Sequence, residues 1–236
     1  MLFRSQEMME KRDSRNTLYH QFDNIEKAII NGQPLELSRV SAPYQRSRVG
    51  IFKVYPLQLA YHDIAWYLLT EDVDTGCLSF SRMNRLANYC RPLSLPCRSL
   101  ELQRNRLNQA YRLLTNGWGL NLGNVEEQKQ ELAGKLSLVN AKVRFYPPTS
   151  QFILEGERRH PRQKIKVGKE DPSTRQAAYI DYQVMLPPRS LDEFSIWVQR
   201  YGDKTLVLAP ESLVERHQQM AIAHFQRYQY NEILGS

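Results

Sequence analysis

The feature that most constrains the fold of this chain is a series of four short apolar segments separated by turn residues. The segments cover residues 35–40, 49–55, 64–70 and 77–83. Their connections at 61–63 and 72–76 are typical of β-hairpins, because Asp and Gly favour tight turns. Short antiparallel strands so close together predict a small barrel or a strongly bent sheet.

A different order of elements is expected in the C-terminal part. Strands are predicted at 141–146, 164–167, 178–186 and 205–208, with a helix at 149–156. A second helix is predicted between Ser190 and Gly202, where Ser190 and Glu193 are spaced as a capping box. The order βαββαβ is that of a ferredoxin-like unit. A last helix is expected over 210–230.

Helical segments are expected before and between these two patterns. Apolar residues recur at helical spacing over 16–31, and Gly32 is a stop signal. Residues 92–98 are rich in Pro and Ser and predict a boundary. One linker helix follows, and then a shorter one opened by the capping pair Asn124 and Glu127. The expected domains are an N-terminal helix (1–32), a β-barrel (33–92), a helical linker (93–138) and a ferredoxin-like domain (139–236).

The composition indicates a globular protein with a basic surface. Of 236 residues, 42% are hydrophobic, which is enough for buried cores. A cytoplasmic location is expected, because the sequence has neither a signal peptide nor an apolar run of about 18 residues. The net charge of +7 favours an anionic partner, although it also serves solubility. The three cysteines are odd in number and lack Cys-x-x-Cys spacing, so free thiols are expected.

Three motifs in the N-terminal half carry a resemblance to a known family. They are Val-Tyr-Pro-Leu-Gln-Leu at 54–59, Ile-Ala-Trp-Tyr-Leu-Leu at 64–69 and Ser-Arg-Met-Asn-Arg-Leu at 81–86. In this order and spacing they resemble the WYL domain of bacterial regulators. The resemblance implies a Sm-like or SH3-like β-barrel that acts as an effector sensor rather than an enzyme.

The C-terminal part resembles the WCX-type extension that often follows WYL domains. The matching elements are Trp197, Gly202, Val207 and Leu-Ala-Pro-Glu-Ser-Leu at 208–213. In that family the extension mediates homodimer contacts, so the resemblance implies a homodimer. The expected fold class is therefore α+β, with a small Sm/SH3-like barrel joined by a helical linker to a ferredoxin-like unit.

The resemblance also selects candidate ligand-binding residues. Arg82 and Arg85 match paired basic positions, and planar guanidinium groups bind phosphate or carboxylate bidentately. In a strand that bends after Met83 they can project toward one concave face, whereas the alternative is two solvated surface arginines. Lys53 matches a position that is often basic in the family. Arg39 stands where the family often has a tyrosine, so the chain departs from the pattern and gains a cation there.

Other candidates lie in the predicted loops and turns. Arg46 and Arg48 are expected to form the rim of a basic groove between the first two strands. Tyr61 and His62 are placed in the turn before the Trp-Tyr-Leu strand, where an aromatic ring can stack on a base. For His62 an ordinary exposed turn is the alternative.

A second basic cluster spans residues 158–169. Interleaved charges on a strand commonly form its solvated face, and no RNA-recognition aromatic motif accompanies them on the central strands. A classical RNA-binding role is therefore not assigned. The cluster can instead extend an electrostatic track for a polyanion.

The sequence offers no catalytic constellation. It has no Gly-x-Ser-x-Gly, no P-loop and no His-Glu-x-x-His. Asp72 and Asp74 precede Gly76 in a hairpin and are expected to form a turn rather than hold a metal. We therefore expect no enzyme, no cofactor and no metal site.

The main hypothesis is a ligand-sensing regulatory module of a WYL-family transcription regulator. Its effector is expected to be anionic, single-stranded nucleic acid or a nucleotide. The first 30 residues are too few for a DNA-reading head of three helices. A head encoded before Met1 would favour this hypothesis, whereas a true start at Met1 would favour the alternative, a CRISPR-associated accessory protein that binds RNA or an effector complex directly. A nucleotide-processing enzyme is a third, disfavoured reading.

Overall fold

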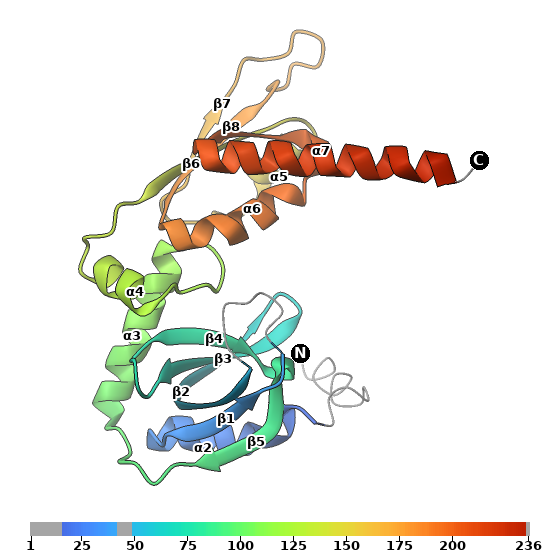
Figure 1. The fold of residues 1–236 in the computed structure, drawn as a ribbon. Coiled ribbons are helices and arrows are strands. Elements are labelled where there is room, and N and C mark those ends of the chain that lie inside the picture. Colours follow the sequence, from blue (N-terminus) through green and yellow to red (C-terminus); the bar gives the residue numbers. More distant parts are fainter. Residues whose placement is uncertain (1–15, 42–48, 235–236) are drawn as a thin grey trace. The chain divides into compact units, whose positions relative to one another are not determined.

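The chain divides into two compact units, each built from an antiparallel sheet and helices (Figure 1). The computed structural model describes residues 16–41 and 49–234. The first unit comprises Met1–Leu114 with Leu120–Lys135, and the second comprises Thr115–Gly119 with Leu136–Ser236. The chain therefore belongs to the α+β class.

The sheet of the first unit has five strands in the order β4-β3-β2-β1-β5. The strands are β1 (Leu35–Arg39), β2 (Gly50–His62), β3 (Ala65–Asp72), β4 (Leu78–Arg82) and β5 (Leu86–Pro92). The long strand β2 pairs with β1 through residues 50–54 and with β3 through residues 54–62. The first half of β2 therefore pairs with β1, and the second half pairs with β3.

From residue 16 on, two helical segments precede this sheet, the 3-10 helix η2 (Leu18–Gln21) and helix α2 (Phe22–Asn31). Their buried residues join a core with the sheet residues Leu35, Leu37 and Leu68. The predicted stop at Gly32 is confirmed, because its φ of 62° is the left-handed conformation that suits a helix C-cap. A Cβ atom at Gly32 would lie 2.4 Å from the carbonyl oxygen of Arg98.

Two predictions about these strands were wrong. The strand expected to end at Tyr55 continues to His62, because a register shift between Pro56 and Gln58 accommodates the missing proline N–H. Strand β5 was not predicted, since its apolar residues do not alternate regularly and only Leu86 is fully buried. It forms an edge of the sheet beside β1, where little apolar surface needs to be covered.

Helices α3 (Leu100–Asn116) and α4 (Val125–Leu132) complete the first unit. Ala110 and Leu113 of α3 share a core with Leu57, Leu69 and Leu78 of the sheet. The predicted cap of α4 is confirmed. Its Asn124 Oδ1 accepts a hydrogen bond of 3.0 Å from the Glu127 N–H, and the Asn124 N–H donates one of 2.8 Å to Glu127 Oε2.

The second unit has a four-stranded sheet in the order β7-β8-β6-β9. Its elements are β6 (Val139–Phe145), α5 (Thr149–Glu155), β7 (Lys164–Val167), β8 (Ile180–Leu186), η4 (Pro188–Ser190), α6 (Leu191–Gln199), η5 (Gly202–Lys204), β9 (Thr205–Ala209) and α7 (Glu211–Leu234). Helices α5, α6 and α7 all contribute to the core that lies on one face of this sheet. The opposite face carries the alternating polar residues.

The predicted capping box of α6 was wrong. The Ser190 side chain makes no cap hydrogen bond. Its Oγ instead accepts a hydrogen bond of 2.9 Å from the backbone N–H of Trp118. A tertiary partner thus replaces the local one that the spacing suggests.

Helix α7 is attached to α6 by polar contacts. His217 Nε2 lies 3.0 Å from Ser195 Oγ, and Arg216 Nη1 lies 2.5 Å from Asp192 Oδ1. Within residues 16–41 and 49–234, no helix has the length and apolar character needed to cross a membrane. Cys77, Cys90 and Cys97 are free thiols, as predicted.

Candidate functional site

Three of the predicted arginines lie around the connection from β4 to β5 in the first unit. Arg39 is the last residue of β1, Arg82 is the last residue of β4, and Arg85 ends the 3-10 helix η3 (Met83–Arg85) that connects β4 to β5. Arg39 faces Leu86 in the strand register, and the next N–H, that of Val40, donates a 3.0 Å hydrogen bond to the Arg85 carbonyl. Backbone pairing therefore fixes this convergence. We call these three residues the arginine end.

The guanidinium of Arg39 reaches across the sheet. Its Nη2 donates a hydrogen bond of 2.7 Å to Ser81 Oγ, and its Cζ lies 4.6 Å from the centroid of the Phe52 ring. Burial lowers the pKa of Arg39 from its ordinary value. Neither a hydroxyl nor an aromatic ring neutralises the charge, so this cation is partly desolvated and has no anionic partner among the described residues.

Arg82 lies in a similar environment. Its Nε is buried and has no hydrogen-bond partner among the described residues. Arg82 lies close enough to Tyr19 to affect its pKa. Burial raises the pKa of Tyr19 above its ordinary value, and a hydrogen bond with the Trp66 backbone and the charge of Arg82 partly oppose this increase. In the described part of the chain, no ion pair joins Arg39 or Arg82 to a carboxylate. The site therefore has unused capacity to bind an anion.

Lys53 does not join the arginine end. It pairs with Glu36 in the register and is exposed, whereas its neighbours Phe52 and Val54 face the core that Arg39 approaches. Glu36 also accepts a 2.6 Å hydrogen bond from the Tyr89 hydroxyl and faces Arg91. Lys53 thus belongs to a charged row on the other side of the sheet.

The two aromatic candidates lie inside β2 rather than in a turn, which corrects their predicted position. Tyr61 pairs with Trp66, and their rings make an edge contact at 5.5 Å. The exposed His62 ring lies 6.3 Å from that of Tyr67, which pairs with Arg82. They are therefore at the same end of β3 as Arg82. Trp66 packs into the core with Leu68, as alternation predicts.

Arg46 and Arg48 lie outside the described residues, so their predicted place on the rim of a groove stays a prediction. Tyr19, Phe52 and Ser81 were missed by sequence reasoning. None of them has a pattern that marks a site, because each acquires its place beside an arginine only through strand register and helix packing.

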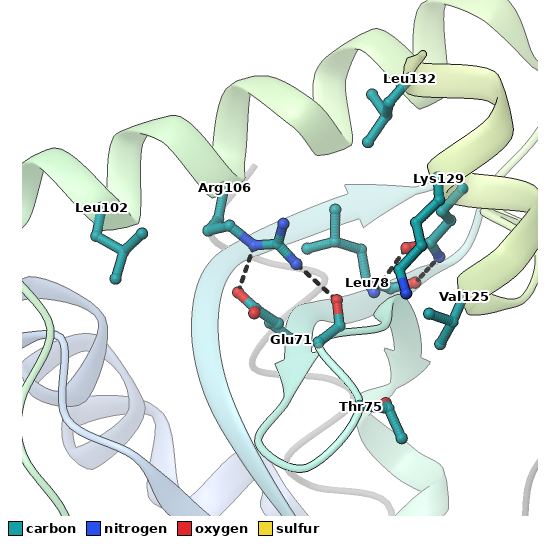
Figure 2. Close-up of a pocket in the computed structure, with 10 residues that line it drawn as sticks. Glu71, Thr75, Leu78, Leu102, Arg106, Val125, Lys129 and Leu132 are labelled. Carbon is teal, nitrogen blue, oxygen red and sulfur yellow. Dashed lines mark hydrogen bonds and ion pairs between the residues drawn. The ribbon is translucent and has the colours of Figure 1, made fainter. Parts of the chain in front are cut away.

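A pocket of about 400 Å³ lies elsewhere in the first unit, between the β3–β4 hairpin and helices α3 and α4 (Figure 2). Arg106 crosses it, donating from Nε to Glu71 Oε2 at 2.7 Å and from Nη2 to the Gly76 carbonyl at 2.6 Å. Glu71 also forms an ion pair with Arg98. The Arg98 and Arg106 guanidinium groups already share the carboxylate of Glu71, which indicates a structural role.

The polar wall of the pocket is equally satisfied. The Gln128 side chain accepts a 3.0 Å hydrogen bond from the Leu78 N–H and donates one of 2.6 Å to the Leu78 carbonyl. Asp72 Oδ1 accepts hydrogen bonds of 2.8 and 2.7 Å from the Thr75 N–H and hydroxyl. Asp72 is therefore a turn former, as predicted. The described residues contain no group of three or more His, Cys, Asp or Glu placed to hold a metal ion.

The second basic cluster separates into two parts. Arg158 binds backbone carbonyls of its own loop, including that of His160 at 3.2 Å, and Arg162 donates to Asn116 Oδ1 at 2.7 Å. His160 itself is buried against Trp118. Lys164 and Lys166, by contrast, project from β7 and are exposed. The arginines of this cluster thus stabilise a loop, and the lysines form part of a surface.

Comparison with known proteins gives limited information. No family model matches the chain, and no curated protein matches it. Among solved structures it is similar to proteasome accessory factor B/C (PafBC) of Arthrobacter aurescens, with 18% sequence identity and a TM-score of 0.32. The match covers 89% of this chain and 27% of that chain. A TM-score of this size does not establish a shared fold, so the WYL resemblance stays a prediction from the sequence motifs.

Proposed function

We propose that this protein is a ligand-sensing regulatory module of the WYL type, and that the arginine end binds an anionic effector. The observation that carries the proposal is the pair of half-buried guanidinium groups, Arg39 and Arg82, that have no carboxylate partner among the described residues. Buried cations are normally paired, because desolvation of a charge is costly. A bound phosphate or carboxylate would supply the missing charge.

Single-stranded nucleic acid or a nucleotide is the proposed effector. Each guanidinium group can bind phosphate oxygens, and Tyr61 and His62 lie at the same end of β3 as Arg82, with exposed side chains. Arg85 would enlarge the positive field. Among the described residues no nucleophile is hydrogen-bonded to a base here, so the proposal is binding without turnover.

The finer fold assignments belong to this proposal. The strand order β4-β3-β2-β1-β5 with a preceding helix supports a Sm/SH3-like barrel, and the order β7-β8-β6-β9 supports a ferredoxin-like, WCX-type unit. A homodimer through that unit, a cytoplasmic location and coupling of effector binding to transcription are implied by the WYL resemblance. Direct binding of RNA or of a CRISPR effector complex is the alternative, and the same basic site would serve it.

The test is fluorescence anisotropy of short labelled single-stranded DNA and RNA over a salt series. Arg82→Gln should weaken binding at least about tenfold, since hydrogen bonds to charged groups contribute about 1.5–3 kcal/mol. Arg39→Lys keeps the charge and loses the fork, so it should also weaken binding. Lys53→Gln removes the same charge from the other side of the sheet and is the matched control.

Circular dichroism and thermal unfolding would verify that each variant stays folded. Equal binding by Arg82→Gln and Lys53→Gln would contradict the site. Binding of a mononucleotide but not of longer strands would restrict the effector to the nucleotide class. Conversion of the bound oligonucleotide to a product would revive an enzymatic function.

A further inference from the structure

The sheet face of the second unit that its helices leave uncovered carries a patterned set of side chains. We call this set the open sheet face. Its residues are Lys142, Arg144 and Tyr146 from β6 and the position after it, Tyr179, Asp181 and Gln183 from β8 and the position before it, and Lys164 and Lys166 from β7. The alternate residues Val143, Phe145, Ile180 and Tyr182 face the core beneath α5, α6 and α7. The strand register therefore separates this surface from the packed face.

The charge of the open sheet face is positive. Its four cations accompany one carboxylate, that of Asp181. Arg144 donates to Asp181 at 2.8 and 3.2 Å, and Lys142 lies 3.3 Å from it. These contacts lower the pKa of Asp181, the largest effect being the hydrogen bond from Arg144. The carboxylate is neutralised within the sheet, which leaves an excess of positive charge on the face.

The cations form two columns on either side of β8. Lys166, Asp181 and Arg144 are cross-strand neighbours, and Lys164, Gln183 and Lys142 form the next row. Columns on β7 and β6 are two strand spacings apart, about 10 Å. A polyanion lying along β8 would therefore meet cations on both sides.

Two tyrosines extend this pattern by one more row. Phe145 and Ile180 form the last pair of β6 and β8, so Tyr146 and Tyr179 follow on the same face as Arg144 and Asp181. The Arg144 Cζ lies 3.7 Å from the centroid of the Tyr179 ring. Both tyrosine residues are half-buried.

Gly168 makes room for the Tyr179 ring. Its N–H donates a 2.9 Å hydrogen bond to the Tyr179 carbonyl. A Cβ atom at position 168 would lie 2.8 Å from three ring carbons of Tyr179. The missing side chain thus allows the ring to lie across the end of β7, beside the lysine column.

We propose that the open sheet face binds single-stranded nucleic acid. Phosphates would lie between the Lys142/Arg144 and Lys164/Lys166 columns. A base would stack on Tyr146, because Arg144 and Gly168 already cover the two faces of the Tyr179 ring. Cations that follow the backbone together with aromatic rings that accept unpaired bases are the combination by which proteins hold single strands. A duplex has its bases already stacked and cannot use the rings. This surface is independent of the arginine end.

The test measures anisotropy of labelled oligodeoxythymidine and oligouridine in an Arg39→Gln/Arg82→Gln background, which removes the proposed effector site. Lys164→Gln/Lys166→Gln should weaken binding about tenfold and make the slope of log K against log salt shallower by about 0.7 for each phosphate that is no longer neutralised. Tyr146→Leu, which keeps an apolar side chain and removes the ring, should weaken binding about fivefold or more. Lys135→Gln/Arg227→Gln removes two exposed cations elsewhere and is the matched control.

The outcomes separate this inference from the proposed function. The open sheet face is supported if the Arg39→Gln/Arg82→Gln background still binds the oligonucleotide and the added Lys164→Gln/Lys166→Gln change abolishes this binding. This result would hold even if the arginine end binds nothing. Equal effects of the lysine variant and the matched control would overturn it. Equal affinity for an abasic oligonucleotide and for oligothymidine would overturn the stacking on Tyr146. The relative affinity for the two probes shows whether DNA or RNA is preferred.

Discussion

Arg98 and Arg106 differ from Arg39 and Arg82 in what surrounds their charge, although all four belong to the first unit. Arg98 and Arg106 share the carboxylate of Glu71, whose side chain is 7% exposed. Arg39 and Arg82 have a serine hydroxyl, aromatic rings and an unpaired Nε around them. The first pair shares a carboxylate, whereas the second has none among residues 16–41 and 49–234. Arginine content alone therefore does not locate a binding site, but the pairing of each guanidinium does.

The largest effect on stability is expected from removing the carboxylate that Arg98 and Arg106 share. Glu71→Gln would leave Arg98 and Arg106 without their carboxylate, and removal of one partner of a buried ion pair costs about 3 kcal/mol. Urea unfolding should show this decrease, and hydrogen exchange should place it in β3 and α3. Glu101→Gln, an exposed position on α3, is the control. A decrease no larger than that of the control would show that the pair has no structural role.

A somewhat smaller effect is expected at the position that holds the Arg98 backbone. Gly32→Ala would place a methyl group 2.4 Å from the Arg98 carbonyl oxygen, in addition to the strain of a positive φ. Gly134→Ala has the same strain, with a φ of 70° and nothing within 4 Å of the added Cβ. Thermal unfolding should show a destabilisation of about 1 kcal/mol for Gly134→Ala and clearly more for Gly32→Ala. Equal destabilisation would mean that the Arg98 loop moves freely.

The Arg144–Asp181 pair extends the comparison to the second unit. Its hydrogen bonds lower the pKa of Asp181 below the ordinary value of 3.8. A depressed pKa stabilises the folded state above the unfolded pKa, and this stability is lost as the pH falls through the folded pKa. Between about pH 5 and pH 2, the free energy of unfolding should therefore decrease less in Asp181→Asn than in the wild type. Asp203→Asn, at an exposed ion pair, should change this slope less.

The smallest effect on stability is expected at Arg82. Arg82→Gln removes a charge that has no carboxylate partner among the described residues, so the free energy of unfolding should change by less than about 1 kcal/mol. Arg106→Gln should cost more, because Glu71 and the Gly76 carbonyl lose a donor. Urea unfolding of both variants checks the order. The reverse order would indicate that Arg82 is a structural residue.

The sequence predicts most of the elements because their signals are local. The stop at Gly32 and the capping box at Asn124 depend on neighbouring residues, and the structure confirms both. Strand β5 and the continuation of β2 beyond Pro56 depend on cross-strand partners, which no local pattern contains. Ser190 likewise has a cap pattern but binds Trp118.

The candidate site was less predictable than the fold, for the same reason. Arg82 and Arg85 could be chosen from their spacing and family resemblance. The register of β1 with β2 and β5 brings Arg39 to Ser81 and places Lys53 opposite Glu36. The sequence does not encode this register locally. Tyr146 and Tyr179 are far apart in the sequence, so their shared row on the open sheet face appears only when β6 pairs with β8.

The most direct test of the proposed effector site is urea unfolding with and without a saturating single-stranded oligonucleotide. A ligand that binds only the folded state stabilises it by about 2.7 kcal/mol at a hundred times its Kd. We predict this stabilisation, located by hydrogen exchange in β1, β4 and β5, for the wild type and for Lys53→Gln, and its absence in Arg82→Gln. Equal stabilisation of Arg82→Gln and the wild type in these strands would contradict the assignment of the arginine end as the effector site.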